Sequence, residues 1–349
     1  MPSPRFASDN VAGAHPTVLE ALVRCNDGPA TAYGDDPWTR RAQQRIREVL
    51  GLPEAAVWPV FGGTGANILA LRAVTHRVDS VVCASSSHIA NAETGAPELV
   101  AGVALVLVPQ VGGKLTPEAV RAALPQRDGD HRPRPRVLSV AQATERGTVY
   151  TPDELAALAE VAHAHDLLLH VDGARLPAAA AALGCSLAAL VGEVGVDVLS
   201  FGGTKAGLVA AEAVVFADPA RAPDAGRHRK QITQLASKQR FVSAQLLALL
   251  EDEAWRGWCL HAHDRAVRLA EGLAAVPGAR LAAPVETNAV FVHLPAEVRA
   301  RLAARWSFET YDPSAGLVRL MTAWDVTDAE VDALLADARR EAAPPRSAE

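Results

Sequence analysis

Short apolar runs alternate with amphipathic, helix-like stretches along most of the chain. Seven of these runs have the character of buried strands, and most of them end in a glycine-rich or polar turn. They cover residues 56–61, 78–83, 103–108, 136–140, 167–171, 197–201 and 213–216. Continuously apolar strands that alternate with helices are typical of a mostly parallel sheet covered on both faces. The pattern therefore predicts an α/β fold built on a seven-stranded, mainly parallel sheet.

Helical periodicity fills the spaces between these strands and dominates the later part of the chain. The predicted helices lie at residues 17–24, 39–50, 91–100, 116–124, 151–165 and from 327 onward, with a helical pattern over 227–276. A smaller α+β unit has strands at 289–293 and 318–321. We therefore predict three parts, which are an N-terminal arm that contributes to the site, a large domain and a small C-terminal α+β domain. Their ranges are 1–38, 39–250 and 251–349.

The composition is that of an ordinary globular protein. Of the 349 residues, 49% are apolar and 21% are charged, and the formal net charge is −6. No Lys/Arg-rich block indicates nucleic acid or an anionic membrane surface, so we expect neither partner. The four cysteines are scattered without metal-ligand spacing, which favours free thiols, no metal site and a reducing compartment. Together with a polar N-terminus and no long apolar run, this predicts a cytoplasmic protein.

The stretch DVLSFGGTKAG, at residues 197–207, carries the strongest chemical signal. An apolar strand runs into Gly202 and Gly203, and the turn then presents Lys205 at the carboxyl end of the strand. A lone lysine in such a loop is usually solvated. Here the apolar flanks favour partial burial, and burial lowers the pKa of a lysine amine and makes it a Schiff-base nucleophile. Taken alone, the stretch is consistent with either interpretation.

A second signal is the glycine-rich turn FGGTGAN, at residues 61–67. Unobstructed backbone amides at a helix N-terminus bind anions, and Thr64 can add a hydroxyl donor. The spacing matches neither the Walker pattern nor the GxGxxG fingerprint, so a phosphate site and a plain strand-to-helix turn both remain open. In a mostly parallel sheet, the turns at the carboxyl ends of the strands converge on one cleft. These turns follow Phe61, Cys83, Val140, Val171 and Phe201.

Asp172 ends the strand that precedes the lysine-bearing strand. A buried lysine, a phosphate-binding turn and an aspartate at this place are the set that pyridoxal 5'-phosphate requires. The lysine holds the cofactor as an imine, and the turn holds its phosphate. The carboxylate keeps the pyridine nitrogen protonated, so that the ring accepts electrons from the substrate Cα.

With these residues in place, the sequence closely resembles the L-threonine aldolases among the fold-type-I, aspartate aminotransferase-like pyridoxal-phosphate enzymes. It is most similar to the low-specificity bacterial branch, which includes phenylserine-type aldolases. The matching motifs occur in family order over nearly the whole chain. They are FASDNVAGAHP, TAYGDD, FGGTGAN, SSSH…ETGAPE, QATERGTVYTPDEL, LHVDGARL, LSFGGTK, SKQRF and VRLMT.

The resemblance implies roles around the cofactor. Lys205, with Thr204 beside it, would hold pyridoxal phosphate as a Schiff base, and Asp172 would pair with the pyridine nitrogen. His88 would stack on the ring and face the substrate hydroxyl, and His131 would be a second catalytic histidine near that hydroxyl. The phosphate cradle would be formed by Gly63, Thr64 and Gly65. Without the resemblance, His88 would be interpreted as a helix-capping or surface histidine, and His131 as part of an exposed loop.

The resemblance also implies how the substrate carboxylate is held. Arg175 would lie near the cofactor and the carboxylate, and Arg319 and Ser8 would bind the carboxylate. Without the family, both arginines could equally be structural ion-pair residues.

Three positions match residues that reach the site of a neighbouring subunit. They are Tyr33, at the substrate, and Arg229 and Lys230, at the phosphate. The resemblance therefore implies a symmetric homo-oligomer, a tetramer assembled as a dimer of dimers.

Four alanines depart from the family pattern. Ala206 replaces an asparagine that commonly follows the lysine, Ala210 and Ala211 replace paired glycines, and Ala92 replaces an acidic residue that precedes the glutamate. None of these changes removes a named catalytic group. They leave the substrate preference and the fit around Lys205 open.

The implied activity is that of a carbon–carbon lyase. It would cleave L-threonine, L-allo-threonine and related β-hydroxy-α-amino acids, such as phenylserine, reversibly to glycine and an aldehyde. His88 or His131, directly or through a water, would accept the β-hydroxyl proton. The alternatives are another fold-type-I lyase or aminotransferase that acts at the amino-acid Cα, and a non-catalytic protein that binds pyridoxal phosphate.

Overall fold

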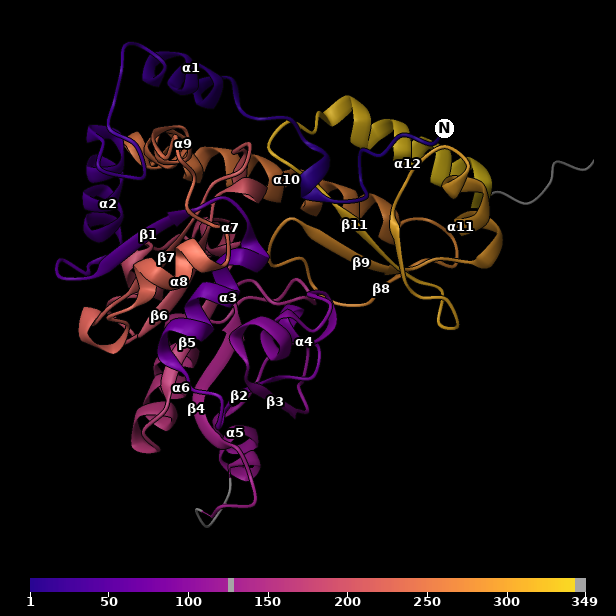
Figure 1. Cartoon of the computed structure of the whole chain (residues 1–349). Helices are drawn as coiled ribbons and strands as arrows, with labels where there is room; N and C mark the ends of the chain where they lie inside the picture. Colours follow the sequence, from indigo (N-terminus) through magenta and orange to yellow (C-terminus); the bar gives the residue numbers. More distant parts are fainter. Residues whose placement is uncertain (125–128, 343–349) are drawn as a thin grey trace, which may run out of the picture.

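Two β-sheets form the framework of the computed structural model, which describes residues 1–124 and 129–342 (Figure 1). The larger sheet has seven strands in the order β1-β7-β6-β5-β4-β2-β3. In chain order they are β1 (Ala56–Val60), β2 (Asp79–Ala84), β3 (Ala104–Val108), β4 (Arg134–Ala141), β5 (Leu168–Gly173), β6 (Val198–Gly202) and β7 (Glu212–Phe216). Each apolar run that the sequence analysis identified forms one of these strands, so the predicted seven-stranded sheet is confirmed.

The sheet is mainly parallel. β6, β5, β4, β2 and β3 pair in parallel, whereas β7 is antiparallel to both of its neighbours, β6 and β1. The carboxyl ends of β4, β5 and β6 therefore share one edge of the sheet with the beginning of β7. This edge is where the topology brings separated parts of the sequence together.

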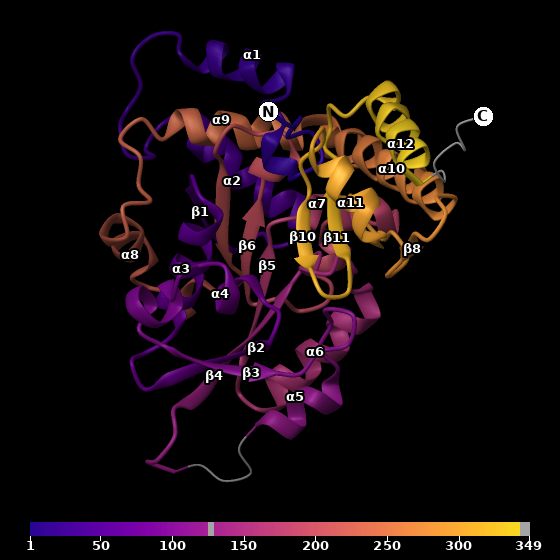
Figure 2. The same cartoon turned by 90° about the vertical axis from the view of Figure 1, so that its right-hand side faces the viewer.

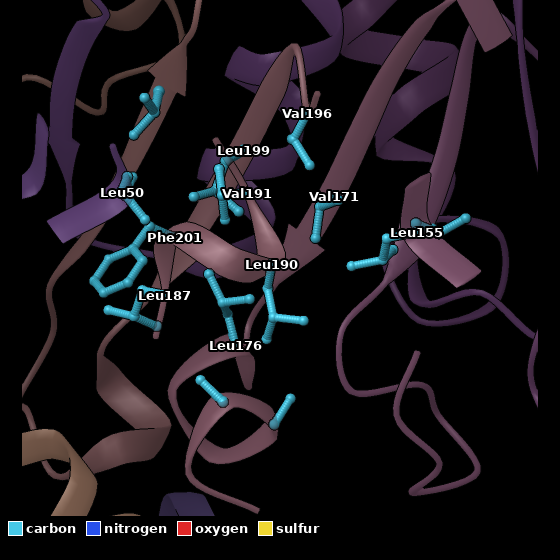
Figure 3. Packing of buried hydrophobic residues seen from close by; sticks show 14 of the residues in the cluster. Leu50, Leu155, Val171, Leu176, Leu187, Leu190, Val191, Val196, Leu199 and Phe201 are labelled. Carbon is cyan, nitrogen blue, oxygen red and sulfur yellow. The ribbon is translucent and has the colours of Figure 1, made fainter. Parts of the chain in front are cut away.

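Side chains alternate between the two faces of the sheet because successive residues of a strand point to opposite sides. In β2, Val82 and Ala84 join one buried cluster, and Val81 and Cys83 join the other. Figure 3 shows the first cluster, where Leu199 and Phe201 of β6 meet residues such as Leu176 of α7 (Leu176–Leu183). Both faces of the sheet are thus covered, which explains why the strands are apolar throughout.

Two groups of helices cover these faces. One group lines the first cluster and contains α2 (Pro37–Leu50), α5 (Pro117–Ala123), α6 (Pro152–Ala164), α7 and α9 (Arg240–Leu250). The other group contains α3 (Gly63–Val74) and α8 (Ala225–Gln231). α1 (Pro16–Cys25) lies along α9 (Figure 1).

Local sequence signals explain where several helices begin and end. The Asp36 side chain accepts the Thr39 N–H at the start of α2, and Gly51 ends that helix in the left-handed conformation at φ 67°. Thr151 and Glu154 form the predicted capping box of α6.

The predicted helix over 91–100 is wrong. The segment instead holds the short α4 (His88–Asn91) and a five-residue π-helical turn over Pro97–Ala101. Between them, Thr94 has φ 53° and Gly95 has φ 70°, a left-handed pair that no α-helix accommodates.

The smaller sheet has the strand order β10-β11-β9-β8 and is antiparallel throughout. Figure 2 shows β10 beside β11. Its strands are β8 (Arg280–Leu281), β9 (Ala289–His293), β10 (Glu309–Asp312) and β11 (Leu317–Met321). Its helices are α10 (Ala254–Ala274), α11 (Ala296–Ala303) and α12 (Asp328–Ala342). Residues 343–349, which the sequence analysis assigned to the same domain, lie outside the described residues.

The N-terminal segment packs on this smaller unit. Phe6 is fully buried in the cluster of the small sheet, with its ring centroid 5.5 Å from that of Trp306. Arg5 forms ion pairs with Asp325 and Glu330 at 2.9 and 2.8 Å. A few residues later the same segment reaches the large sheet, so the arm connects both units.

The four cysteines are free thiols, as the sequence analysis expected. In the described part of the chain, no helix combines the length and the apolar character that crossing a membrane requires.

Two glycines of α10 give a matched test of the packing between α10 and α12. A Cβ on Gly272 would lie 2.3 Å from Leu335 Cδ1, whereas a Cβ on Gly257 would meet nothing within 4 Å. We expect Gly257→Ala to raise the free energy of unfolding by about 1 kcal/mol through helix propensity. Gly272→Ala should lower it by about 1–3 kcal/mol through overpacking. Denaturant unfolding of both variants measures the difference, and equal effects would contradict this packing.

Candidate functional site

A cavity of about 280 Å³ opens at the carboxyl edge of the large sheet. This volume is close to the lower end of pockets that hold small molecules. Seven of the residues that the sequence analysis singled out line it, and they are Gly63, Thr64, His88, Asp172, Arg175, Thr204 and Lys205. The convergence of strand ends on one cleft, which the order of the elements predicted, is therefore confirmed.

Lys205 lies in the one-turn 3₁₀ helix Thr204–Ala206, directly after β6. The side chain is largely buried, and among the described residues its amine has no hydrogen-bond or ion-pair partner. The positive charge of Arg175 lowers the pKa of Lys205, and burial lowers it further. The turn thus presents an amine whose neutral, nucleophilic form is favoured.

The N-terminus of α3 forms an open cradle beside the lysine. Gly62 is the N-cap and offers no side-chain cap, so the first backbone N–H groups of the helix have no capping acceptor. A Cβ on Gly63 would meet nothing within 4 Å, which leaves space above these donors. Gly65 also leaves room for a neighbouring side chain, because a Cβ there would lie 2.3 Å from the side chain of Gln234. Gly63 and Thr64 line the pocket, and Gly65 makes room for Gln234, which accepts the Phe61 N–H at 3.2 Å.

Asp172, on β5, is held in a buried amide–carboxylate network. It is 7% exposed, and its Oδ2 accepts a hydrogen bond from Asn67 Nδ2 at 2.8 Å. Its Oδ1 accepts the Ala174 N–H at 3.1 Å. The same Asn67 Nδ2 donates to Glu93 Oε1 at 2.8 Å, so one amide orients two carboxylates.

His88 is the first residue of α4 and is partly exposed to the pocket. Its Nδ1 lies 2.8 Å from Glu93 Oε1, and its backbone N–H donates to Glu145 Oε1 at 2.7 Å. The hydrogen bond with Glu93 raises the pKa of His88 above its ordinary value, although burial opposes this effect. Burial raises the pKa of Glu145 to about 7. Because Nδ1 is engaged with the carboxylate, Nε2 is the nitrogen that is left to serve a substrate.

Arg175 is fixed by a buried ion pair with the N-terminal arm. Its Nε and Nη2 donate to Asp9 Oδ2 and Oδ1 at 2.7 and 3.0 Å. Asp9 is 3% exposed and also accepts from Asn288 Nδ2 at 3.2 Å. Burial acts to raise the pKa of the Asp9 carboxyl, but the charge of Arg175 outweighs it and the pKa is lowered. Ser8 caps the turn that carries Asp9 and accepts the Asn10 N–H at 3.1 Å.

Arg319, on β11, lies close enough to interact electrostatically with Arg175 and Asp9. It forms an ion pair with Glu309 on the neighbouring strand β10. Its Nε is buried and has no hydrogen-bond partner within residues 1–124 and 129–342. Burial lowers the pKa of Arg319. A buried guanidinium N–H without an acceptor has free capacity for an anionic ligand.

Tyr33, Arg229 and Lys230 do not line the pocket of their own chain. Lys230 lies over the Tyr33 ring, 4.9 Å from its centroid. Arg229 is 5% exposed, lies over the Trp58 ring and donates to the Pro59 carbonyl at 3.1 Å. Burial lowers the pKa of Arg229 to about 10. Tyr33 is 52% exposed and Lys230 is exposed, whereas Arg229 is much less accessible than the sequence suggests.

His131, expected near the substrate hydroxyl, does not line the pocket of its own chain. His131 is exposed and precedes β4 by three residues, at the amino edge of the sheet. The pocket lies at the carboxyl edge, where Ala141 ends β4. The strand from Arg134 to Ala141 has seven steps of about 3.3 Å, which separates the two edges by about 23 Å. His131 therefore cannot reach the pocket of its own chain.

Several polar residues of the pocket have no role that was predicted from the sequence. These are Asn67, Glu93, Glu145 and Glu212, together with Asp9 behind Arg175. Three of the four pocket residues lie inside the motifs FGGTGAN, ETGAPE and QATERG, and Asp9 lies inside FASDN. The signal was therefore present as motif membership. The sequence did not reveal which side chains of those motifs point at one another.

The pocket fits pyridoxal phosphate. It combines a partly desolvated lysine, a buried carboxylate, an uncapped helix N-terminus with space above it, and a histidine on the opposite wall. Fold and pocket together define a fold-type-I, aspartate aminotransferase-like enzyme. The fold is shared with aspartate aminotransferase of Thermus thermophilus, with a TM-score of 0.68 at 23% identity over 94% of this chain and 88% of that one.

Comparison with known proteins makes the family specific. Residues 5–297 match the beta-eliminating lyase family, and the chain belongs to that family. It is 42% identical over 339 residues to the low specificity L-threonine aldolase of a Pseudomonas species, which covers 97% of both chains. Its identity to the enzyme of that name from Pseudomonas aeruginosa is 43% over 337 residues, or 96% of this chain and 97% of that one. The threonine aldolase of Leishmania major superposes with a TM-score of 0.92 at 30% identity, over 98% of this chain and all of that one.

The contact between His88 and Glu93 generates a pKa prediction. Glu93→Gln replaces the carboxylate by a neutral amide that no longer stabilises an imidazolium, so the pKa of His88 should fall. NMR titration of the histidine ring protons measures this change. The signals of His163, whose Nε2 lies 2.8 Å from Asp197 Oδ2, serve as the internal control and should not move. An unchanged His88 titration would mean that Asp172, not Glu93, raises its pKa.

Proposed function

We propose that this protein is a pyridoxal-phosphate-dependent aldehyde-lyase with the activity of a low-specificity L-threonine aldolase. Its substrates are L-threonine, L-allo-threonine and related β-hydroxy-α-amino acids such as phenylserine, which it cleaves reversibly to glycine and an aldehyde. The observation that carries the proposal is the placement of the partnerless Lys205 amine in one pocket with Asp172 and His88. The names of the relatives, at 42% and 43% identity over nearly the full length, support the choice of reaction.

Different residues of the pocket would hold different parts of the cofactor. The backbone N–H groups of Gly63, Thr64 and Gly65 at the start of α3 would hold the phosphate, where the helix dipole also favours negative charge. Asp172 would hold a proton on the ring nitrogen, and Asn67 keeps the Asp172 carboxylate in place at 2.8 Å. When bound, pyridoxal phosphate supplies an electron sink for the bond that breaks at the substrate Cα.

The substrate carboxylate is bound by the cationic groups that still have donors available. Arg175 uses Nε and Nη2 for Asp9, which leaves Nη1 for the substrate. Arg319 offers its buried Nε, which has no partner in the described structure. Ser8 adds its hydroxyl from the arm, in exchange for the 3.4 Å hydrogen bond that it donates to Asp9 Oδ1. Two cations and a hydroxyl from three segments fix the orientation of the substrate, so that the Cα–Cβ bond is the one that is activated.

His88 acts as the base for the β-hydroxyl. Its Nδ1 faces Glu93 at 2.8 Å, so the neutral ring carries its proton on Nδ1 and its lone pair on Nε2. Nε2 accepts the hydroxyl proton, and the Glu93 carboxylate stabilises the imidazolium that forms. The arrangement is analogous to the carboxylate–histidine pair of serine hydrolases, in which the acid orients the ring and balances its charge.

The assembly is part of the proposal. Tyr33, Lys230 and Arg229 lie outside the pocket of their own chain, and the same is true of His131. We assign Tyr33 to the substrate and Arg229 and Lys230 to the phosphate of a neighbouring subunit, in a homotetramer built as a dimer of dimers. The Lys230 ammonium lies over the Tyr33 ring, so both side chains belong to one exposed patch. Four free thiols support a reducing, cytoplasmic compartment.

An aldehyde-release assay tests this function. The purified protein, supplied with pyridoxal phosphate, should release acetaldehyde from L-threonine and benzaldehyde from phenylserine, with glycine as the second product. Lys205→Ala should abolish both reactions, because no other lysine of the described residues lines the pocket. Borohydride reduction followed by peptide mapping should mark Lys205. A label on another lysine, or cleavage that survives in Lys205→Ala, would refute the assignment.

The placement of the two histidines generates a second test. His88→Phe keeps a ring but loses Nε2, so kcat/KM for phenylserine cleavage should fall by about 10²–10⁴. Exchange of the glycine α-proton, which involves no β-hydroxyl, should fall much less. His131→Ala should leave both rates almost unchanged, because the residue lies at the opposite edge of the sheet from the pocket of its own chain. A loss in His131→Ala equal to that in His88→Phe would place His131 in the pocket of a neighbouring subunit.

A further inference from the structure

Glu212 is a buried acid in the pocket that the proposed mechanism does not use. It is the first residue of β7, and in the sheet it pairs with Gly202 of β6 on one side and Val60 of β1 on the other. It is 6% exposed and lines the same cavity as Lys205. A buried carboxyl group is costly unless its hydrogen bonds are satisfied, so its partners indicate its role.

The partners of Glu212 are all in the turn that carries Lys205. Its Oε2 accepts the Gly203 N–H at 2.7 Å. The Thr204 hydroxyl and the Thr204 backbone N–H also hydrogen-bond to this carboxyl group. The Thr204 Oγ1 in turn accepts the Ala211 N–H at 3.2 Å. Glu212 therefore caps the 3₁₀ turn Thr204–Ala206 from outside and closes the loop that begins at Gly203.

The loop between Gly203 and Glu212 is tightly packed. A Cβ on Gly203 would lie 2.4 Å from Leu208 Cδ1 and 2.6 Å from the Ala211 carbonyl oxygen. A Cβ on Gly202 would lie 2.6 Å from the Ala174 Cα. The backbone at the base of Lys205 thus has little space to shift, and the hydrogen bonds to Glu212 fix the direction in which the turn leaves the sheet.

Lys205 is the cation that faces Glu212. The flanking strands β1 and β6 carry no charged residue, and α3, which packs on β7, carries only Arg72 in its last turn. The other titratable and charged side chains of the cavity are Arg175, Asp172, His88, Glu93 and Glu145. Burial raises the pKa of Glu212 to about 7, although its three donors and the charge of Lys205 oppose this. The charge of Arg175 lowers the pKa of the Lys205 amine. The charges of Asp9, Asp172 and Glu212 act to raise it.

We propose that Glu212 is a positioning residue for Lys205. Glu212 holds the turn that carries the lysine and sets the charge of the lysine amine. This inference rests on the role that the proposed function gives to Lys205. When Glu212 is ionised, its charge stabilises the Lys205 ammonium. When Glu212 is protonated, that support is lost and the ammonium releases its proton more readily. No covalent bond changes, and the proton is exchanged with solvent or between the two groups.

The apoprotein allows a direct test that needs no cofactor and no activity. The reaction of the Lys205 amine with trinitrobenzenesulfonate, followed by mass spectrometry of the Lys205 peptide as a function of pH, gives the titration midpoint of that amine. Glu212→Gln keeps the shape of the side chain and removes its charge, so the midpoint should fall by about one unit. Glu212→Asp retains the charge, so its midpoint should lie above that of Glu212→Gln.

Asp79→Asn is the matched control. Asp79 is also a buried carboxylate, with 1% exposure and an ion pair to Arg134 at 2.8 Å, but it lies at the amino end of β2. Its loss lowers stability without placing a charge change near Lys205. The Lys205 midpoint should therefore equal that of the wild type. An equal fall in Asp79→Asn and Glu212→Gln would overturn the proposal, because the shift would then reflect general loosening.

The remaining outcomes are also decisive. An unchanged midpoint in Glu212→Gln overturns the proposal. If Glu212→Gln does not fold, the pH profile of Lys205 labelling in the wild type tests the proposal instead. Coupling to Glu212 predicts a second inflection near pH 7 in that profile, and a single inflection overturns the proposal. Aldehyde release by the wild type, measured separately, tests the proposed function. A shifted midpoint without aldehyde release would reject the aldolase and keep the influence of Glu212 on Lys205.

Discussion

The buried ion pair between Asp9 and Arg175 connects the parts of the molecule that form the site. Asp9 comes from the N-terminal arm and Arg175 from the turn after β5, and Asn288, next to the small sheet, donates to the same carboxylate at 3.2 Å. Removing one partner of such a buried pair costs about 3–5 kcal/mol, because it leaves an uncompensated charge. The pair also has an electrostatic consequence, since the charge of Arg175 is the main cause of the lowered Lys205 pKa. The positions of the arm, the small sheet and the reactive amine thus depend on one contact.

A second polar network organises the opposite wall of the pocket. The amide of Asn67 donates to both Asp172 and Glu93 at 2.8 Å, and Glu93 in turn holds His88. The carboxylate proposed for the ring nitrogen and the histidine proposed as the base are therefore oriented by a single side chain of α3. Together with Glu212 beneath the Lys205 turn, these residues surround the cavity with groups whose charges depend on one another. Changing one of them is expected to affect the titration of its neighbours.

The seven strands and their carboxyl-edge cleft could be predicted because a two-sided sheet requires apolar runs with polar turns at their ends. Most site residues followed from the same logic, since Lys205, Asp172 and the glycine turn lie at strand ends. The prediction failed where long-range packing decides. The helix expected over 91–100 is interrupted by the left-handed Thr94 and Gly95. The resemblance gave His131 a role near the substrate hydroxyl, and only the structure showed that it precedes β4, at the edge of the sheet opposite the pocket of its own chain.

The sequence by itself determined the strand pattern, the helix caps and the chemical identity of the groups at the strand ends. These are local properties, set by residue type, periodicity and the nearest neighbours along the chain. Only the tertiary structure decided which groups meet. Asp9 is 166 residues from Arg175, Asn67 is 105 residues from Asp172, and Arg229 is buried against the Trp58 ring rather than exposed. Those contacts produce the burial and the charge pairing that shift the pKa values of Lys205, His88 and Glu212. The order of residues along the chain does not state which of them are close in space.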